Sequence, residues 1–204
     1  MRFEEFKRKI KKSPLFGGDV ANLFAADPQV MRNQLLRWKK RGLVVRLRKG
    51  IYSLSREERR TALSRELIAA NLYQPSYISL ESALSYYKLI PEKVVAVTSV
   101  TTRKTKSFEN EEGLFLYRQL KKTAYFGFRQ ARDEGGFPYF IAEPEKALLD
   151  YLYLNLGSVG SDPSGYLRDS LRLQNRSSLN KRKLANFAAR YGVNKLIRTI
   201  EEMK

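Results

Sequence analysis

One stretch of this chain decides how the N-terminal region folds: residues 27 to 54, DPQVMRNQLLRWKKRGLVVRLRKGIYSL. Asp27 suits the N-cap position, because its carboxylate can accept hydrogen bonds from the free N–H groups of the first helical turn. Pro28 suits the first helical position, where the missing N–H would have no partner inside the helix. Together they predict a helix that runs to Arg41 and stops at Gly42.

The residues after Gly42 change from helical to strand patterning. The segments 43–47 and 51–54 are dominated by β-branched and other apolar residues, which favours two short strands. The turn between them ends in Gly50, where a hairpin needs a positive φ. We therefore expect an antiparallel hairpin whose tip carries three cations: Arg46, Arg48 and Lys49.

The predicted helix has two contrasting faces. At about 100° per residue, Met31, Leu35 and Trp38 form one stripe, which we expect to pack against the rest of the domain. The opposite face carries amide and cationic side chains, namely Gln29, Asn33, Arg37 and Lys40, with Arg32 at its edge. Guanidinium and amide groups pair well with base edges in the DNA major groove, and the hairpin cations could contact the flanking phosphates. This face is therefore a candidate DNA-recognition surface.

Two shorter helices are expected before Asp27. Aromatic and aliphatic residues recur at helical spacing up to Ile10, and Ser13-Pro14 ends that helix because proline has no N–H to donate. Asp19 would cap the second helix. Its apolar face would consist of Val20, Leu23 and Phe24. A helix, a capped turn, a basic helix and a hairpin in this order predict a winged helix-turn-helix DNA-binding domain over residues 1 to 55.

The composition narrows the possible functions. The 204 residues include no cysteine and no histidine, so the chain lacks a thiol nucleophile and the commonest metal ligand. We expect no catalytic residues, no metal and no cofactor. The chain also has no apolar run long enough for a signal peptide or a membrane span, which predicts a cytoplasmic protein without membrane contact.

The distribution of charge points to nucleic acid as a partner. The formal net charge is +18, and residues 1 to 60 contribute most of it, with 17 basic and 6 acidic side chains. Residues 61 to 160 are nearly balanced, with 12 and 11. A charge excess concentrated in one module favours contact between that module and a polyanion, although a solvated basic face would give the same count.

The remaining residues, 56 to 204, predict a larger α+β domain. Helical patterns are expected at residues 56–72, 79–87, 143–156, 166–173, 180–191 and 193–203. Strand patterns are expected at residues 94–100, 114–117, 124–128 and 139–141, with a basic loop at 103–108. The whole protein is therefore predicted to be of the α+β class, with a small sheet and C-terminal helices in its second domain.

Several segments resemble the AbiEi family of antitoxins. They are residues 19–54, 77–84 (YISLESAL), 97–102 (VTSVTT), 126–127 (FG) and 141–150 (IAEPEKALLD), of which the last is the most specific. The polar residues of interest in these motifs are Ser82, Glu143, Glu145, Lys146 and Asp150.

The resemblance implies a transcriptional autorepressor in a type IV toxin–antitoxin system, encoded beside a nucleotidyltransferase toxin in phage-defence or maintenance operons. The N-terminal winged helix would bind double-stranded DNA at inverted repeats in its own promoter. The second domain would counter the toxin, in at least some members without a stable complex.

The residues alone leave a metal-dependent nuclease open. A lysine and four carboxylates could together hold magnesium and activate water: Glu81, Glu143, Glu145, Lys146 and Asp150. However, Glu143 and Glu145 are two residues apart at a helix start, so their side chains should diverge. Acidic residues there also suit the positive end of the helix dipole, which favours a structural role.

A second alternative is an RNA- or protein-binding module whose winged helix has lost DNA recognition. Six aromatic residues could stack on unpaired bases, or could fill the core instead: Tyr86, Tyr87, Tyr125, Phe126, Tyr139 and Phe140. Their strand-like alternation favours the core.

Overall fold

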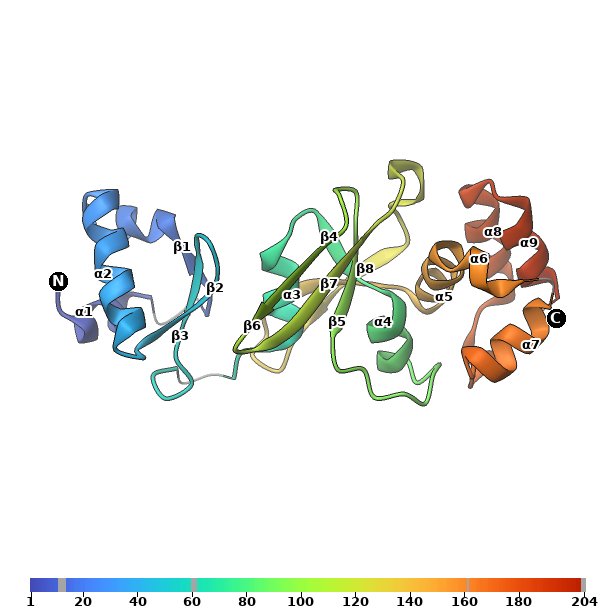
Figure 1. Ribbon diagram of the computed structural model, residues 1–204, viewed down its shortest axis with the longest axis horizontal. Helices are drawn as coiled ribbons and strands as arrows, with labels where there is room; N and C mark the ends of the chain where they lie inside the picture. Colours follow the sequence, from blue (N-terminus) through green and yellow to red (C-terminus); the bar gives the residue numbers. More distant parts are fainter. Residues whose placement is uncertain (11–13, 60–61, 161, 203–204) are drawn as a thin grey trace.

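The computed structural model describes residues 1–10, 14–59, 62–160 and 162–202 (Figure 1). As predicted, the protein is of the α+β class, with a three-stranded antiparallel sheet and a six-stranded mixed sheet. The molecule is elongated: an N-terminal unit lies at one end, the larger sheet lies in the middle, and the C-terminal helices lie at the other end (Figure 1).

The N-terminal unit combines helical segments with the smaller sheet. Its helical segments are α1 (Phe3–Lys9), the 3₁₀ helix η1 (Gly18–Phe24) and α2 (Pro28–Lys40). Its strands are β1 (Phe16–Gly17), β2 (Val44–Arg48) and β3 (Ile51–Leu54), in the order β1-β3-β2. The helix at residues 28–41 and the following hairpin were thus predicted to within one residue at each end, whereas the two-residue strand β1 was not predicted.

Local capping explains where α2 begins and ends. Asp27 Oδ1 accepts hydrogen bonds from the backbone N–H groups of Gln29 and Val30, at 2.8 and 3.0 Å. At the other end, Gly42 adopts a φ of 71°, a left-handed conformation that a residue with a Cβ rarely takes. Gly50 adopts a φ of 84° in the hairpin turn, as the sequence predicted.

Aromatic side chains form the centre of the N-terminal core. The rings of Phe6 and Trp38 lie 4.6 Å apart, and Phe6 also makes an edge contact with Phe16 at 5.3 Å. Met31 and Leu35 complete the buried stripe of α2 with Trp38, as predicted. This stripe fixes the rotation of α2 about its axis, so the opposite side of the helix faces solvent.

The prediction for the second short helix was partly wrong. η1 is a 3₁₀ helix with Gly17 at its N-cap position, and Leu23 is 60% exposed although it was placed on the apolar face. A 3₁₀ helix has about three residues per turn, which changes the positions that share a face. The side chain of Asp19 and the predicted break at Ser13 lie outside the described residues.

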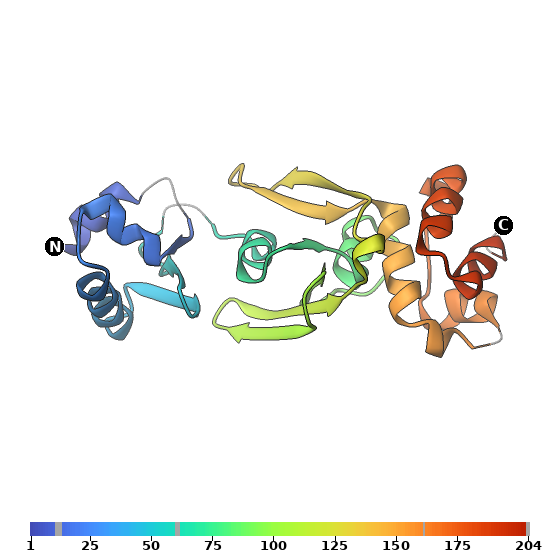
Figure 2. The ribbon, with the colours of Figure 1, turned by 90° about the horizontal axis from the view of Figure 1, so that it is seen from above.

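The strands of the larger sheet are β4 (Ser76–Ile78), β5 (Val97–Thr101), β6 (Lys106–Asn110), β7 (Gly113–Gln119), β8 (Phe128–Arg132) and β9 (Pro138–Ala142). Their order is β6-β7-β5-β4-β9-β8, with parallel pairing for β5–β7 and β4–β9. Figure 2 shows the β8–β9 hairpin standing apart from the β6–β7 hairpin, with α3 (Arg65–Leu72) between them.

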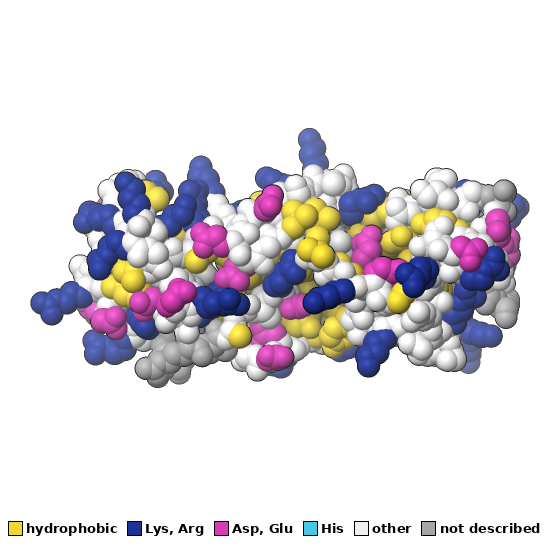
Figure 3. Space-filling model, turned by 60° about the horizontal axis from the view of Figure 1, so that its bottom comes forward, with side chains coloured by type: hydrophobic (Ala, Val, Ile, Leu, Met, Phe, Trp, Pro, Cys, Tyr) yellow, Lys and Arg dark blue, Asp and Glu magenta, His cyan; other side chains and the backbone are white. Residues whose placement is uncertain are grey.

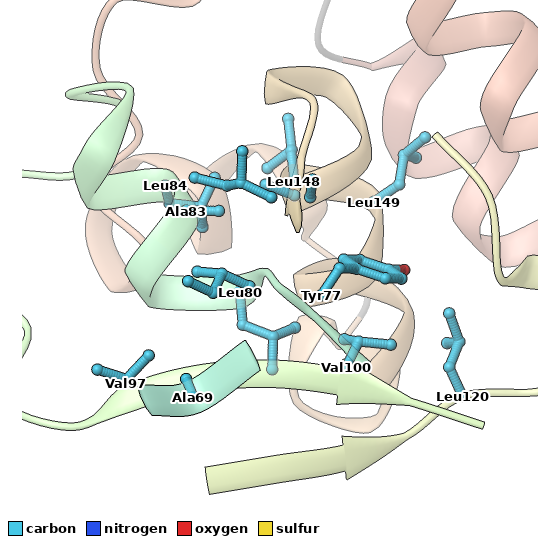
Figure 4. Packing of buried hydrophobic residues seen from close by; sticks show 14 of the residues in the cluster. Ala69, Tyr77, Leu80, Ala83, Leu84, Val97, Val100, Leu120, Leu148 and Leu149 are labelled. Atoms are coloured by element: carbon cyan, nitrogen blue, oxygen red, sulfur yellow. The ribbon is translucent and has the colours of Figure 1, made fainter. Parts of the chain in front are cut away.

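Further helices pack on the larger sheet and beyond it. They are α4 (Leu80–Tyr86), α5 (Pro144–Leu154), α6 (Leu156–Val159), α7 (Pro163–Gly165), the π-helical turn η3 (Tyr166–Ser170), α8 (Lys181–Tyr191) and α9 (Asn194–Glu201). Two short 3₁₀ helices, η2 (Lys122–Ala124) and η4 (Arg176–Ser178), join the others. The main core lies where α4 and α5 meet the sheet. Ala83 and Leu84 of α4 lie beside Leu148 of α5, and Leu80 and Leu149 belong to the same cluster (Figure 4).

Three predictions for this region are corrected. The helix expected from residue 56 begins at Arg65, because Ser64 caps it through a hydrogen bond from the N–H of Leu67, while residues 55 to 59 form a turn. The strand expected at residues 124–128 begins only at Phe128. The loop expected at 103–108 becomes strand β6 from Lys106, and strand β4 was not predicted.

Strand β2 links the two hydrophobic cores. Val44 belongs to the N-terminal core, whereas Val45 and Leu47 belong to the main core. Successive residues of a strand point to opposite faces, so the side chain of Val44 lies on one side of the small sheet and those of Val45 and Leu47 lie on the other. Asn110 of β6 donates a hydrogen bond from Nδ2 to the carbonyl oxygen of Leu47 at 3.1 Å. The small sheet therefore packs between the N-terminal helices and the larger sheet (Figure 1).

None of the helices in the described part of the chain combines the length and the apolar character needed to cross a bilayer.

Candidate nucleic-acid interface

The outer face of α2 is fully accessible. Met31, Leu35 and Trp38 are at most 2% exposed, and the five predicted recognition residues all lie on the exposed side: Gln29, Arg32, Asn33, Arg37 and Lys40. Neither the hairpin nor the larger sheet covers them. α2 therefore presents one continuous polar and cationic face to solvent.

Side chains in the first two turns of α2 hydrogen-bond to each other. Gln29 Nε2 donates to Asn33 Oδ1 at 3.2 Å, and Arg32 Nη1 donates to Gln29 Oε1 at 3.1 Å. These contacts are exposed and weak, so a base edge could replace them at little cost. They hold the amide and guanidinium groups side by side at the N-terminal end of the helix.

The cations of this face form no salt bridge in the described part of the chain. Within residues 1–10, 14–59, 62–160 and 162–202, the salt bridges involve other basic residues, such as Lys7 with Glu58 and Arg59 with Glu112. Figure 3 shows Lys and Arg side chains projecting along the whole length of one face of the molecule. A cation without an ion-pair partner stays available for a phosphate or a base acceptor.

The three hairpin cations are not equivalent. Arg48 and Lys49 are exposed at the turn, whereas Arg46 is half-buried opposite Tyr52 of β3. Burial raises the pKa of the Tyr117 hydroxyl on β7, and the positive charge of Arg48 partly opposes this shift. The structure therefore presents Arg48 and Lys49 to solvent at the turn and leaves Arg46 partly covered.

Two apolar residues on α2 were not singled out as possible contacts. Val30 is 60% exposed and Leu36 is 40% exposed, although both are large hydrophobic residues. At about 100° per residue, Leu36 points partly away from the buried stripe, and the N-terminal position of Val30 is the only sequence signal for its exposure. Such side chains can contact the methyl group of thymine in a major groove.

The charged motif of α5 has a different environment, because its core is a buried network. The Asp150 carboxylate accepts hydrogen bonds at Oδ2 from Tyr77 Oη (2.9 Å) and Ser79 Oγ (2.8 Å). Its Oδ1 accepts from Tyr191 Oη at 2.6 Å and forms an ion pair with Lys146. Lys146 and Asp150 are both fully buried. The network ties β4, α5 and α8 together.

Burial shifts the pKa values in this network in opposite directions. Desolvation lowers the pKa of Lys146, and the neighbouring Asp150 charge partly compensates for it. Desolvation raises the pKa values of Tyr77 and Tyr191, to which the Asp150 charge adds. Both tyrosines therefore remain neutral hydrogen-bond donors at ordinary pH.

The other motif residues also make structural contacts. Glu145 Oε1 accepts a hydrogen bond from the backbone N–H of Asn180 at 2.8 Å. Glu143 forms an ion pair with Lys183 of α8. Ser82 Oγ accepts from the N–H of Thr98 at 2.8 Å and donates to the carbonyl oxygen of Ala96 at 3.2 Å, which joins α4 to β5.

These carboxylates do not converge on one point. Glu143, Glu145 and Asp150 face different partners. The divergence of Glu143 and Glu145 was predicted from their two-residue spacing at the start of α5. Across the described residues, no three acidic side chains lie together in a way that could hold a metal ion. The geometry therefore does not favour the nuclease hypothesis.

Most of the six aromatic candidates lie in or against the main core. Tyr139 is buried, and Tyr87, Tyr125 and Phe126 are half-buried there. Two are exposed: Tyr86 (53%) and Phe140 (46%).

Comparison of the chain with models of known protein families and with curated proteins finds no match.

Proposed function

We propose that this protein is a sequence-specific DNA-binding repressor whose N-terminal unit is a winged helix-turn-helix. In this proposal α2 is the recognition helix and lies in the major groove of DNA. The observation that carries it is the exposed polar and cationic face of α2, opposite the buried Met31–Leu35–Trp38 stripe. A helix that is packed against the core on one side and exposed to solvent on the other can approach a groove without rearrangement of the domain.

The chemistry of this face suits base recognition. Arg32 and Arg37 can donate two hydrogen bonds each to guanine, and Gln29 or Asn33 can pair with adenine. The 13 residues of α2 extend about 20 Å at 1.5 Å per residue, enough to cover several base pairs in a groove about 12 Å wide. Lys40 and the hairpin cations would bind phosphates and set the register.

We further propose that the repressor acts as the antitoxin of a type IV system and controls its own promoter in the cytoplasm. The resemblance of its motifs to the AbiEi family supports this proposal. In it, the buried Lys146–Asp150 network holds the second domain in shape, and the surface of that domain counters the nucleotidyltransferase toxin. A nucleotidyltransferase gene next to this one would support the pairing.

Fluorescence anisotropy with the upstream region of its own gene tests the DNA-binding proposal. The wild type should bind this duplex more tightly than a shuffled duplex or RNA at matched salt. Arg37→Ala should weaken binding by roughly 5- to 150-fold, because one good base contact contributes about 1–3 kcal/mol. Lys93→Ala removes the same charge from an exposed loop away from α2, so it serves as the matched control.

The salt dependence provides an independent check. The logarithm of the binding constant should fall linearly with the logarithm of the salt concentration, by a slope of about 0.9 for each neutralised phosphate. Binding that is independent of salt, or equal weakening in Arg37→Ala and Lys93→Ala, would contradict the proposed role of α2.

A further inference from the structure

A second candidate site lies on the larger sheet, away from α2. A cavity of about 420 Å³ opens where the β8–β9 hairpin separates from β4 and from the C-terminal end of α3. Figure 2 shows the hairpin extending from the sheet beside α3. The volume falls within the roughly 300–1,000 Å³ that small-molecule sites occupy. Neither the DNA-binding proposal nor the buried network uses this cavity.

Aromatic rings form the walls of the cavity. Phe128 makes edge contacts with Phe140 at 5.5 Å and with Tyr125 at 5.2 Å, at interplanar angles of 75° and 61°. Phe128 also stacks on Tyr77, at 4.7 Å and an interplanar angle of 19°, so one of its faces is already covered. Phe140 is 46% exposed, which is unusual for a phenylalanine. A flat ligand could stack on it.

Polar groups on the other side of the cavity have unused hydrogen-bonding capacity. Asn71 and Gln74 donate their amide N–H groups to the carbonyl oxygens of Leu67 and Ala70, which orients their side-chain oxygens as fixed acceptors. Ser76 also lines the cavity, but its hydroxyl oxygen is buried and is not accessible from the cavity.

The electrostatics of the lining restrict the ligand. In the described part of the chain, the cavity is lined by aromatic, amide, hydroxyl and small apolar residues, without a Lys, Arg, Asp or Glu. A phosphate or carboxylate inside would lose its hydration without gaining an opposite charge. The ligand should therefore be flat, uncharged and able to hydrogen-bond along its edge.

We propose that this cavity binds one unpaired nucleobase. A base has two π faces for Phe140 and its neighbours, and an edge of donors and acceptors for the amides of Asn71 and Gln74. The base could come from a free nucleoside or from a single-stranded nucleic acid whose phosphates stay outside the cavity. This site is separate from the duplex-binding face of α2 and does not depend on it.

Ligand-detected NMR titrations of the full chain with adenosine, guanosine, cytidine and uridine test the proposal. Short single-stranded oligonucleotides form a second arm, and ribose serves as the ligand without a base. At least one nucleoside or oligonucleotide should bind, and Phe140→Ala should weaken that binding roughly tenfold, since stacking contributes about 1–3 kcal/mol per base. Binding of nucleosides identifies free bases as the source, and binding of oligonucleotides alone identifies a strand.

Two variants control for indirect effects. Tyr86→Ala removes an exposed aromatic ring that does not line the cavity, so it should bind as the wild type does. Arg37→Ala should also retain base binding, because α2 lies in the other unit. Absence of binding at millimolar ligand in both arms, or equal binding by the wild type and a folded Phe140→Ala variant, would overturn the proposal.

Discussion

The helices α2 and α5 both carry charged residues, and the two helices use them in opposite ways. In α2, Arg32 and Arg37 face solvent and no acidic side chain pairs with them in the described part of the chain. In α5, Lys146 and Asp150 are fully buried and satisfied by each other and by hydroxyl groups. Charge on a helix is therefore no sign of a site by itself. Its position relative to the apolar stripe decides whether it can meet a partner.

The largest effect is expected when the buried network of α5 is broken. Asp150→Ala should lower the free energy of unfolding by about 3–5 kcal/mol, because it leaves Lys146 as an unpaired buried cation. Urea denaturation followed by circular dichroism measures this. Arg37→Ala on the exposed face of α2 should change stability by no more than about 0.5 kcal/mol. Similar losses in the two variants would remove the distinction between the helices.

A smaller effect is expected at the boundary between the two units. Leu47→Ala should lower the free energy of unfolding by about 2 kcal/mol, at the low end for a buried leucine, because neighbouring side chains at a boundary can partly fill the space. Trp38 is the only tryptophan, so its fluorescence reports on the N-terminal unit alone.

The two units should unfold together in the wild type, since β2 contributes to both cores. Coincident transitions by Trp38 fluorescence and by circular dichroism would support this. Leu36→Ala is the matched control, as Leu36 is 40% exposed and should cost little. If the Leu47→Ala variant is as stable as this control, the proposed coupling through β2 is wrong.

The smallest effect is expected at the cap of α2. Asp27→Ala removes the acceptor of two hydrogen bonds and should cost about 1 kcal/mol of stability. The fraying would reach Gln29, so DNA binding should also weaken slightly. Asp27→Asn keeps an acceptor oxygen and should restore most of both properties. An equal loss in both variants would point to the charge of Asp27 instead of its hydrogen bonds.

The sequence predicted the elements whose signals are local. Asp27, Pro28 and Gly42 mark both ends of α2, and its apolar spacing indicated which residues are buried. The α+β class and the order of the main helices followed in the same way. The exposure of the α2 candidates could be predicted because the helical period alone assigns them to the face opposite Trp38.

The features that were not predicted depend on distant partners. Strands β1 and β4 are two and three residues long, too short for a pattern, and exist because neighbouring strands pair with them. The burial of Asp150 depends on hydroxyl groups of Tyr77 and Tyr191, which are 73 and 41 residues away in the sequence. The cavity beside Phe140 likewise combines residues from α3 and β8–β9.

A base-substitution scan of the promoter duplex tests the role of α2 most directly. Each position of the bound site is changed in turn, and affinities are measured for the wild type, Arg37→Ala and Lys49→Ala. Arg37→Ala should lose discrimination at one base position, whereas Lys49→Ala should weaken all duplexes alike and reduce the salt slope by about 1. If Arg37→Ala keeps the wild-type preference at every position, α2 does not read the sequence.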